Sequence, residues 1–187
     1  NNVIKNEPEN IRGLIVRSKI YNKIKGYDKA LSDYEKLITI DPKNPELYFW
    51  RTDVYEDLEN YEKAIEDYNI SIGLDSLFGK YYLGRADAYK KLEEFEKALK
   101  DYDKAIELEP NNDVFYSDRA KFYYYQYKDN NKAIEDFEKA IEINSNKAEY
   151  FIELGNIYAY NERNNEALKS FEIAINLNSS YSSIYYY

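Results

Sequence analysis

Residues 45–78 read PELYFWRTDVYEDLENYEKAIEDYNISIGLDSLF, and this stretch decides the fold. In its second half, apolar and small residues fall at i, i+3, i+4, i+7 and i+11, which is one stripe of an α-helix: Tyr61, Ala64, Ile65, Tyr68 and Ile72. A similar stripe precedes it, made of Tyr48, Thr52, Tyr55 and Leu58. The stretch therefore predicts two successive amphipathic helices.

The same pattern recurs along the chain at intervals of 34 or 35 residues. A small residue recurs at Ala30, Ala64, Ala98, Ala133 and Ala167. An aromatic follows each of them four residues later, at Tyr34, Tyr68, Tyr102, Phe137 and Phe171. Alanine lets the two helices of a hairpin approach closely, but one hairpin cannot bury both of its faces. The repeat therefore predicts a stack of helical hairpins.

This pattern resembles the tetratricopeptide repeat, in which large, small, aromatic and proline positions recur over 34 residues. The third unit shows the pattern fully, in Tyr82, Ala86, Tyr89, Ala98, Tyr102 and Pro110. The chain departs from it at the closing proline (Ser76, Ser145, Ser179), at the first aromatic (Leu14) and at one small position (Leu37, Ser71). The resemblance covers residues 11–181 and implies an all-α, right-handed superhelical solenoid of about five helix-turn-helix repeats.

We expect repeats near 11–44, 45–78, 79–112, 113–147 and 148–181. A lead-in is expected at 1–10, and the start of a further helix or a truncated cap at 182–187. The expected helices are 11–24 and 27–40, 45–58 and 61–74, 79–92 and 95–108, 113–127 and 130–143, and 148–161 and 164–177.

The fourth unit contains one extra residue, which coincides with the run Tyr123–Tyr127. We expect a lengthened helix and a looser turn at 128–131. The alternative is a tyrosine-rich binding patch, because Tyr is favoured in binding surfaces.

Two charged positions recur together in the first four units. Arginines stand at Arg17, Arg51, Arg85 and Arg119, and aspartates stand at Asp33, Asp67, Asp101 and Asp136. In the fifth unit both charges vanish, leaving Leu154 and Ser170. This joint loss predicts an Arg–Asp contact between paired helices. The alternative is an arginine ladder that recognises an acidic ligand.

The composition narrows the function classes. The net charge is -9 and the pI is about 4.8, whereas nucleic acid and anionic membranes require basic surfaces. No apolar run approaches the ~20 residues of a membrane span. His and Cys are absent, so no such side chain can serve as base, nucleophile or metal ligand. We expect a protein that is not an enzyme, with no cofactor and no metal.

The sequence starts at Asn1 without Met, which indicates a trimmed chain from which a leader could have been removed. Localisation therefore stays unknown, with a soluble cytoplasmic protein slightly favoured.

In tetratricopeptide proteins the first helices of successive units line a concave groove, and partner peptides usually lie there. Carried onto this chain, the resemblance implies three rows of groove residues: Ile15, Phe49, Leu83, Ser117 and Ile152; Lys19, Asp53, Asp87, Lys121 and Asn156; and Asn22, Glu56, Lys90, Tyr124 and Ala159. The candidate binding residues are Ile15, Lys19, Phe49, Asp53, Leu83, Asp87, Lys121, Tyr124, Ile152 and Asn156. The groove thus combines an apolar row with an acidic centre.

We expect a scaffold or adaptor that binds a peptide segment of a partner protein carrying hydrophobic and basic residues. The apolar row would also arise from packing against a terminal segment, or by chance. Some family members hold a carboxylate tail through Lys, Asn and Arg. At the equivalent positions this chain has Ile15, Lys19, Trp50, Lys80 and Gly84, of which only Lys80 fits, while Lys19 stands where Asn is expected; we therefore expect no such capture. The alternative function is a structural module that stacks end to end through its C-terminal end, near Tyr185.

Overall fold

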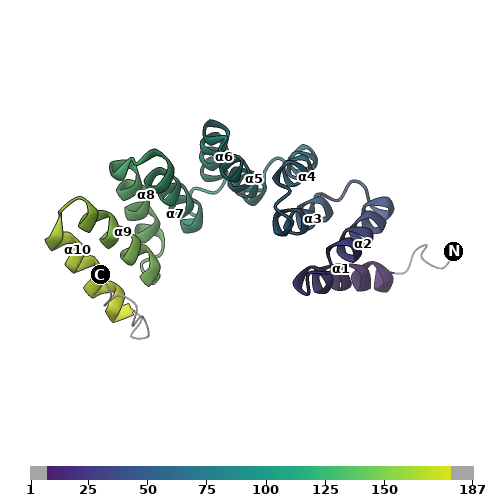
Figure 1. Cartoon of the computed structure of the whole chain (residues 1–187), viewed down its shortest axis with the longest axis horizontal. Coiled ribbons are helices and arrows are strands. Elements are labelled where there is room, and N and C mark those ends of the chain that lie inside the picture. The colour runs from purple at the N-terminus through teal and green to yellow at the C-terminus, as the bar shows by residue number, and fades with distance from the viewer. Residues whose placement is uncertain (1–7, 178–187) are drawn as a thin grey trace. The chain divides into compact units, whose positions relative to one another are not determined.

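The structure, a computed structural model, describes residues 8–177, which form helices joined by short turns (Figure 1). The elements are α1 (Pro8–Lys23), α2 (Tyr27–Ile40), α3 (Pro45–Asp57), α4 (Tyr61–Leu74), α5 (Gly79–Lys91), α6 (Phe95–Leu108), α7 (Asp113–Phe122), η1 (Tyr123–Tyr127), α8 (Asn130–Ile143), α9 (Ala148–Tyr160) and α10 (Asn164–Leu177). Consecutive helices pair as hairpins, and no strand occurs within 8–177. The all-α fold of paired helices predicted from the sequence is confirmed.

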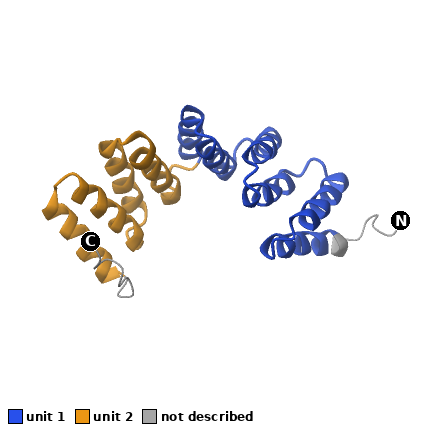
Figure 2. Ribbon diagram, in the orientation of Figure 1, with its two compact units in different colours: residues 1–108 blue, residues 109–187 orange. Residues whose placement is uncertain are grey.

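The chain divides into two compact units (Figure 2). Unit 1 comprises residues 1–108 with α1–α6, and unit 2 comprises residues 109–187 with α7–α10. α1 begins at Pro8, within the expected lead-in, where proline suits the first turn of a helix. The expectations for residues 1–7 and 178–187, including Tyr185, lie outside the described residues.

The turn inside each hairpin uses one left-handed residue. Lys25, Glu59, Glu93, Lys128 and Glu162 have φ between 55° and 60°. In the first hairpin the residue after it, Gly26, donates its N–H to the Tyr21 carbonyl at 2.8 Å. A side chain at positive φ costs roughly 1–2 kcal/mol. The tight turn therefore persists because the packing of the two helices outweighs that cost.

The extra residue of the fourth repeat lies in its first helix and not in the turn that follows. Residues 123–127 form a π-helical turn. Its backbone hydrogen bonds span five residues, whereas those of an α-helix span four, so the turn accommodates one extra residue. The closing bond runs from the Asp129 N–H to the Tyr123 carbonyl, six residues back, whereas the equivalent bond spans five residues from Gly26 to Tyr21. The left-handed residue, Lys128, keeps its place. The expected lengthened helix is therefore present, as α7 followed by η1, whereas the expected looser turn at 128–131 was wrong.

Small residues let the paired helices approach closely. The five recurring alanines are at most 3% exposed. Two glycines in first helices permit still closer contacts. A Cβ at Gly84 would lie 2.3 Å from the hydroxyl of Tyr68, and one at Gly155 would lie 2.6 Å from the ring of Phe171. At these two sites the first helix packs directly onto an aromatic of a second helix.

The predicted Arg–Asp contact between paired helices is confirmed in the first four hairpins. In each, the arginine Nε and Nη2 donate to the two carboxylate oxygens at 2.7–2.8 Å. The aspartates are only 2–6% exposed. In the fifth hairpin Leu154 and Ser170 replace the arginine and the aspartate. Both are buried, and the Ser170 hydroxyl donates to the Glu166 carbonyl at 2.9 Å. A buried carboxylate needs such a partner, so the arginine fork serves the hairpin.

Candidate functional site

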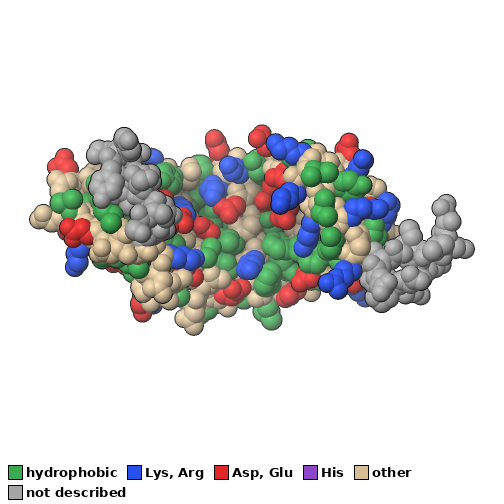
Figure 3. Space-filling view, turned by 90° about the horizontal axis from the view of Figure 1, so that it is seen from below, with side chains coloured by type: hydrophobic (Ala, Val, Ile, Leu, Met, Phe, Trp, Pro, Cys, Tyr) green, Lys and Arg blue, Asp and Glu red, His purple; other side chains and the backbone are tan. Residues whose placement is uncertain are grey.

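The candidate residues of unit 1 lie on its first helices. α1, α3 and α5 follow one another along one side of unit 1, and α2, α4 and α6 along the other (Figure 1). Figure 3 views the side of the first helices, where hydrophobic side chains lie among acidic and basic ones. The interval of 34 residues places equivalent side chains at equivalent helix positions. The members of each expected row therefore share one position on successive first helices of unit 1.

The apolar row of unit 1 is half-buried. Ile15 packs against the core that holds Leu14 and Tyr34. The Phe49 ring lies 5.1 Å from the Tyr81 ring and 6.1 Å from the Tyr68 ring. These contacts, and the partial burial of Leu83, leave the row half-buried.

The side chains of the apolar row are therefore only partly open to solvent. Neighbouring helices of the stack cover part of each side chain, which a single repeat in isolation does not reveal. Part of each side chain nevertheless stays open for a partner.

Lys19 is engaged with an aromatic ring. Its Nζ lies 4.0 Å from the centroid of the Trp50 ring, a cation–π contact between α1 and α3. Lys80 lies over the Phe78 ring at 5.9 Å. Lys80, which fits a carboxylate-tail site, and Lys19, which stands where such a site needs Asn, thus each lie over a ring.

Carboxylates from α3 and α5 come together beside Lys19. Glu56 accepts a hydrogen bond from the Tyr68 hydroxyl at 2.7 Å. Desolvation raises the pKa of Glu56 to about 7, and the charges of Asp53, Asp87 and Asp57 add to the rise, against the Tyr68 hydrogen bond. Glu56 therefore changes its charge near neutral pH.

Asp53 shares the same surroundings. Desolvation raises its pKa, the charge of Asp57 adds to this, and the charge of Lys19 opposes it. Asp53, Glu56 and Asp87, named here the acidic cluster, thus gather three carboxylates on the first-helix side of unit 1. The acidic centre expected from the sequence is present there.

Asp87 belongs to a small polar network. It accepts a hydrogen bond from the Tyr102 hydroxyl at 2.7 Å and forms a salt bridge with Lys90. The Lys90 ammonium also donates to the Tyr102 hydroxyl at 3.3 Å. Lys90 therefore neutralises part of the charge at this end of the cluster, so Asp53 and Glu56 are the more available acids.

Unit 2 carries different chemistry at the equivalent positions. Lys121 forms a salt bridge with Glu149 at 2.7 Å. The ring of Tyr124 lies 4.9 Å from that of Tyr125 and 6.3 Å from that of Tyr160. These rings form an aromatic group, to which the π-helical turn contributes Tyr124 and Tyr125.

The remaining candidates of unit 2 differ in exposure. Ser117 is buried, with its hydroxyl bonded to the Val114 carbonyl at 2.9 Å, so it is not part of an accessible row. Ile152 is half-buried against the core that holds Phe151. Asn156 and Ala159 are exposed.

Sequence reasoning missed the second-helix hydroxyls that reach the acidic cluster. Tyr68 and Tyr102 were assigned only to the core, yet their hydroxyls bond Glu56 and Asp87. A signal was present, because this recurring aromatic is Tyr in unit 1 and Phe in unit 2. Tyr rather than Phe at a core position indicates that a polar group lies within hydrogen-bonding distance of the hydroxyl, because a buried Tyr hydroxyl usually has a partner.

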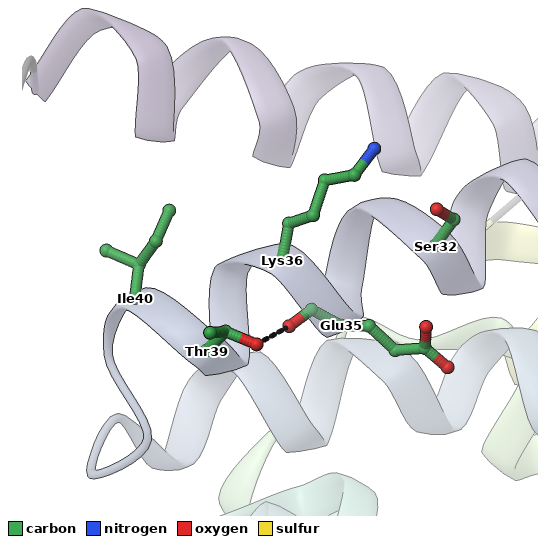
Figure 4. Close-up of a pocket in the computed structure, with 5 residues that line it drawn as sticks. All are labelled: Ser32, Glu35, Lys36, Thr39 and Ile40. Carbon is green, nitrogen blue, oxygen red and sulfur yellow. Dashed lines mark hydrogen bonds between the residues drawn. The ribbon is translucent and has the colours of Figure 1, made fainter. Parts of the chain in front are cut away.

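A shallow depression of about 420 Å³ lies elsewhere, on the solvent side of α2 (Figure 4). It is lined by Ser32, Glu35, Lys36, Thr39 and Ile40. The Thr39 hydroxyl donates to the Glu35 carbonyl at 2.8 Å, an ordinary contact within a helix. No candidate residue lines this depression, so it is not part of the site.

Two other kinds of site were sought in the described part of the chain. Among residues 8–177, no group of three or more acidic side chains is arranged to hold a metal ion. None of the helices described has both the length and the apolar composition to cross a membrane.

Solved structures similar to this chain share its paired helices. The crystal structure of MamA has a TM-score of 0.76 at 23% identity, over 89% of this chain and 96% of that one. PilF of Pseudomonas aeruginosa has a TM-score of 0.78 at 17% identity, over 90% and 76%. YrrB, described as a TPR protein with an unusual peptide-binding site, has a TM-score of 0.67 at 21% identity, over 90% and 86%. At these identities the likeness establishes the fold.

Family models match most of the sequence. A tetratricopeptide-repeat model matches residues 79–112, a TPR-repeat model matches 19–59, and a second tetratricopeptide-repeat model matches 45–76, 119–147 and 148–181. A search of curated protein sequences gave no significant match. By these family matches and its paired helices, the chain belongs to the tetratricopeptide-repeat family.

Proposed function

We propose that this protein is a scaffold that binds a segment of a partner protein on the first-helix side of unit 1. The observation that carries the proposal is the acidic cluster beside the half-buried apolar row. The segment carries apolar side chains for the row of Ile15, Phe49 and Leu83, and Lys or Arg for the cluster. A binding role, without catalysis, is typical of the family, and the similar protein YrrB is described as having a peptide-binding site.

Unit 2 offers a surface of its own. Lys121, Tyr124, Ile152 and Asn156 supply a base, an aromatic ring, an aliphatic side chain and an amide. We expect this surface to contact a less basic part of a partner, because it lacks the acidic cluster.

Proton binding at Glu56 makes the interaction depend on pH. At pH 6 Glu56 is mostly protonated, and at pH 8 it is mostly ionised, because its pKa is about 7. A basic segment is therefore bound more tightly at pH 8. Salt weakens the interaction, because the charges lie near the surface. A Kd around micromolar, or roughly 8 kcal/mol, is expected.

The test starts with affinity capture of a partner from lysate of the source cells. The captured partner is then bound to the parent and to a variant carrying Asp53→Asn, Glu56→Gln and Asp87→Asn. These changes remove charge while keeping side-chain shape, so Phe49 and its neighbours stay packed. We expect about tenfold or greater weakening, since charge pairs at interfaces are worth a few kcal/mol.

The matched control removes the same number of charges from the second helices. Glu62→Gln, Glu66→Gln and Glu96→Gln change exposed acids of α4 and α6. This control is expected to bind as the parent does. Equal binding by the parent and the acidic-cluster variant would move the site away from the first helices and overturn the proposal.

A further inference from the structure

The outer face of α1 is apolar and exposed. Val16 and Ile20 of α1, and Ile24 just after its last residue, recur every four residues and are 50%, 53% and 66% exposed. Large apolar side chains in a row on one helix face mark an interaction surface more often than isolated ones do.

The other hairpins show what normally lies on this face. Ile20 stands at the position of Val54, Ala88 and Ile157 in α3, α5 and α9, and these three are at most 1% exposed. Val54 shares a core with Tyr34 of α2, Ala88 with Tyr68 of α4, and Ile157 with Phe137 of α8. In each case the second helix of the preceding hairpin covers the first helix. The face of α1 therefore has the form of a surface made to receive a second helix.

The last helix carries the complementary half. Leu168 of α10 stands at the position of Leu31, Ile65 and Ile134. Those three pack in or against cores shared with the following first helix. Leu168 is instead 62% exposed.

The arginines of α3 and α5 also have partners on the preceding second helix. The Arg85 Nη1 donates to Asn69 Oδ1 of the preceding second helix at 2.6 Å, and Glu35 acts electrostatically on Arg51. The side chains of Arg51 and Arg85 are 16% and 18% exposed, whereas that of Arg17 in α1 is 52% exposed.

The residue of α10 equivalent to Glu35 and Asn69 is Glu172, which is exposed. The exposed Arg17 of α1 and the exposed Glu172 of α10 therefore carry opposite charges on these two faces.

We infer that copies of this chain associate head to tail, with α10 of one copy packed on the exposed face of α1 of the next. Leu168 then covers the stripe of Val16 and Ile20, and Glu172 pairs with Arg17. An interface between two different faces leaves one of each free, so association continues into rings or filaments. This inference goes beyond the proposed function, because it concerns neither the acidic cluster nor a partner protein.

The first measurement is the mass of the full chain in solution, by sedimentation or light scattering. Samples from about 1 μM to about 1 mM cover the range of weak association. We expect the mass to rise above the 22.3 kDa of one chain as the concentration increases. A single-chain mass throughout would overturn the inference and leave a preceding segment of a longer chain, or another protein, as the occupant of α1.

Complementation distinguishes this interface from any other. Ile20→Glu alters only the α1 face, and Leu168→Lys alters only the α10 face. Both side chains are exposed, so folding is preserved. Each variant alone is expected to remain a single chain. Mixed together they restore association, because the intact α10 of the first meets the intact α1 of the second, and the two introduced side chains, which carry opposite charges, meet at the alternate contacts.

Leu77→Glu serves as the matched control. Leu77 is 75% exposed in the turn before α5, away from both faces, and its substitution is expected to leave association unchanged. Association by either face variant alone, or failure of the mixture to associate, would contradict the proposed interface.

Discussion

Unit 1 and unit 2 use the same hairpin but place different chemistry on their first helices. In unit 1 the second helices carry Tyr68 and Tyr102, and their hydroxyls bond carboxylates at Glu56 and Asp87. In unit 2 the same aromatic is Phe137 or Phe171, which has no hydroxyl to donate. The facing surface there carries tyrosine rings and an amide.

In the second and third hairpins of unit 1 the tyrosine hydroxyl and the carboxylate that accepts from it occur together. A carboxylate that is partly desolvated needs a donor, and a tyrosine in the core supplies one at no cost to packing. Where this aromatic is Phe, the equivalent first-helix positions carry no carboxylate: they hold Lys121, Tyr124, Asn156 and Ala159. Partner chemistry can therefore change between units while the core keeps its shape.

The largest expected effect comes from giving unit 1 the arrangement of the last hairpin of unit 2. Arg85→Leu alone strands the buried Asp101 and is expected to cost about 3–5 kcal/mol of unfolding free energy. Adding Asp101→Ser reproduces Leu154 with Ser170 and is expected to recover much of that loss. Urea unfolding of both single variants and the double variant measures the coupling, and additive losses would rule out the pairing.

The acidic cluster is expected to make the stability of unit 1 depend on pH. Between pH 4.5 and 7 Glu56 ionises in the unfolded chain but stays protonated in the fold, since its folded pKa is about 7. Stability therefore falls as pH rises through this window, by up to about 3 kcal/mol, and the contribution is constant below and above it.

Glu56→Gln removes this dependence. The variant is expected to be more stable than the parent at pH 8 and similar to it at pH 4.5. Denaturant unfolding of both proteins at several pH values makes the comparison. The same slope in both between pH 4.5 and 7 would assign the effect to another acid.

Replacing glycine by alanine is expected to cost more stability at Gly84 in unit 1 than at Gly155 in unit 2. Gly84→Ala meets Tyr68, which is buried and bonded to Glu56, so we expect a loss of about 2–3 kcal/mol. Gly155→Ala meets Phe171, which is half-buried and can move, so about 1–2 kcal/mol is expected. Thermal unfolding gives both values.

Gly13→Ala is the control for this pair. No atom lies within 4 Å of a Cβ at Gly13, and alanine favours helix, so we expect a gain of about 0.5–1 kcal/mol. Equal losses at Gly84 and Gly155 would show that the hydroxyl bond does not stiffen unit 1.

An effect as small as that at Gly155 is expected from removing one hydroxyl. Tyr68→Phe makes this position of unit 1 resemble unit 2 and is expected to cost about 1–2 kcal/mol, because a hydrogen bond to an acid is lost. A double-mutant cycle with Glu56→Ala isolates the contact. Zero coupling in the cycle would mean that Glu56 is satisfied by solvent instead.

Much of the fold followed from local spacing. The second helices begin and end where the sequence predicted, at 27–40, 61–74, 95–108, 130–143 and 164–177. The Arg–Asp contact was predicted because two positions on paired helices changed together. The π-helical turn was not, because an extra residue can enter a helix or a turn, and only the packing of Tyr123 and its neighbours selects the helix.

The candidate site was only partly predictable. The sequence identified the acidic positions Asp53 and Asp87, since they share one helix position in successive repeats. It did not reveal that Lys19 lies over Trp50 or that Phe49 is half-buried. These facts depend on how one hairpin packs on the next.

The sequence by itself determined the repeat, its helices and the charged pairs, because helix periodicity and the 34-residue interval are local properties of the chain. Only the tertiary structure decided the pKa of Glu56, the burial of the apolar row and the exposure of Ile20. Desolvation and burial are sums over atoms of several helices. No single helix contains the information needed to predict them.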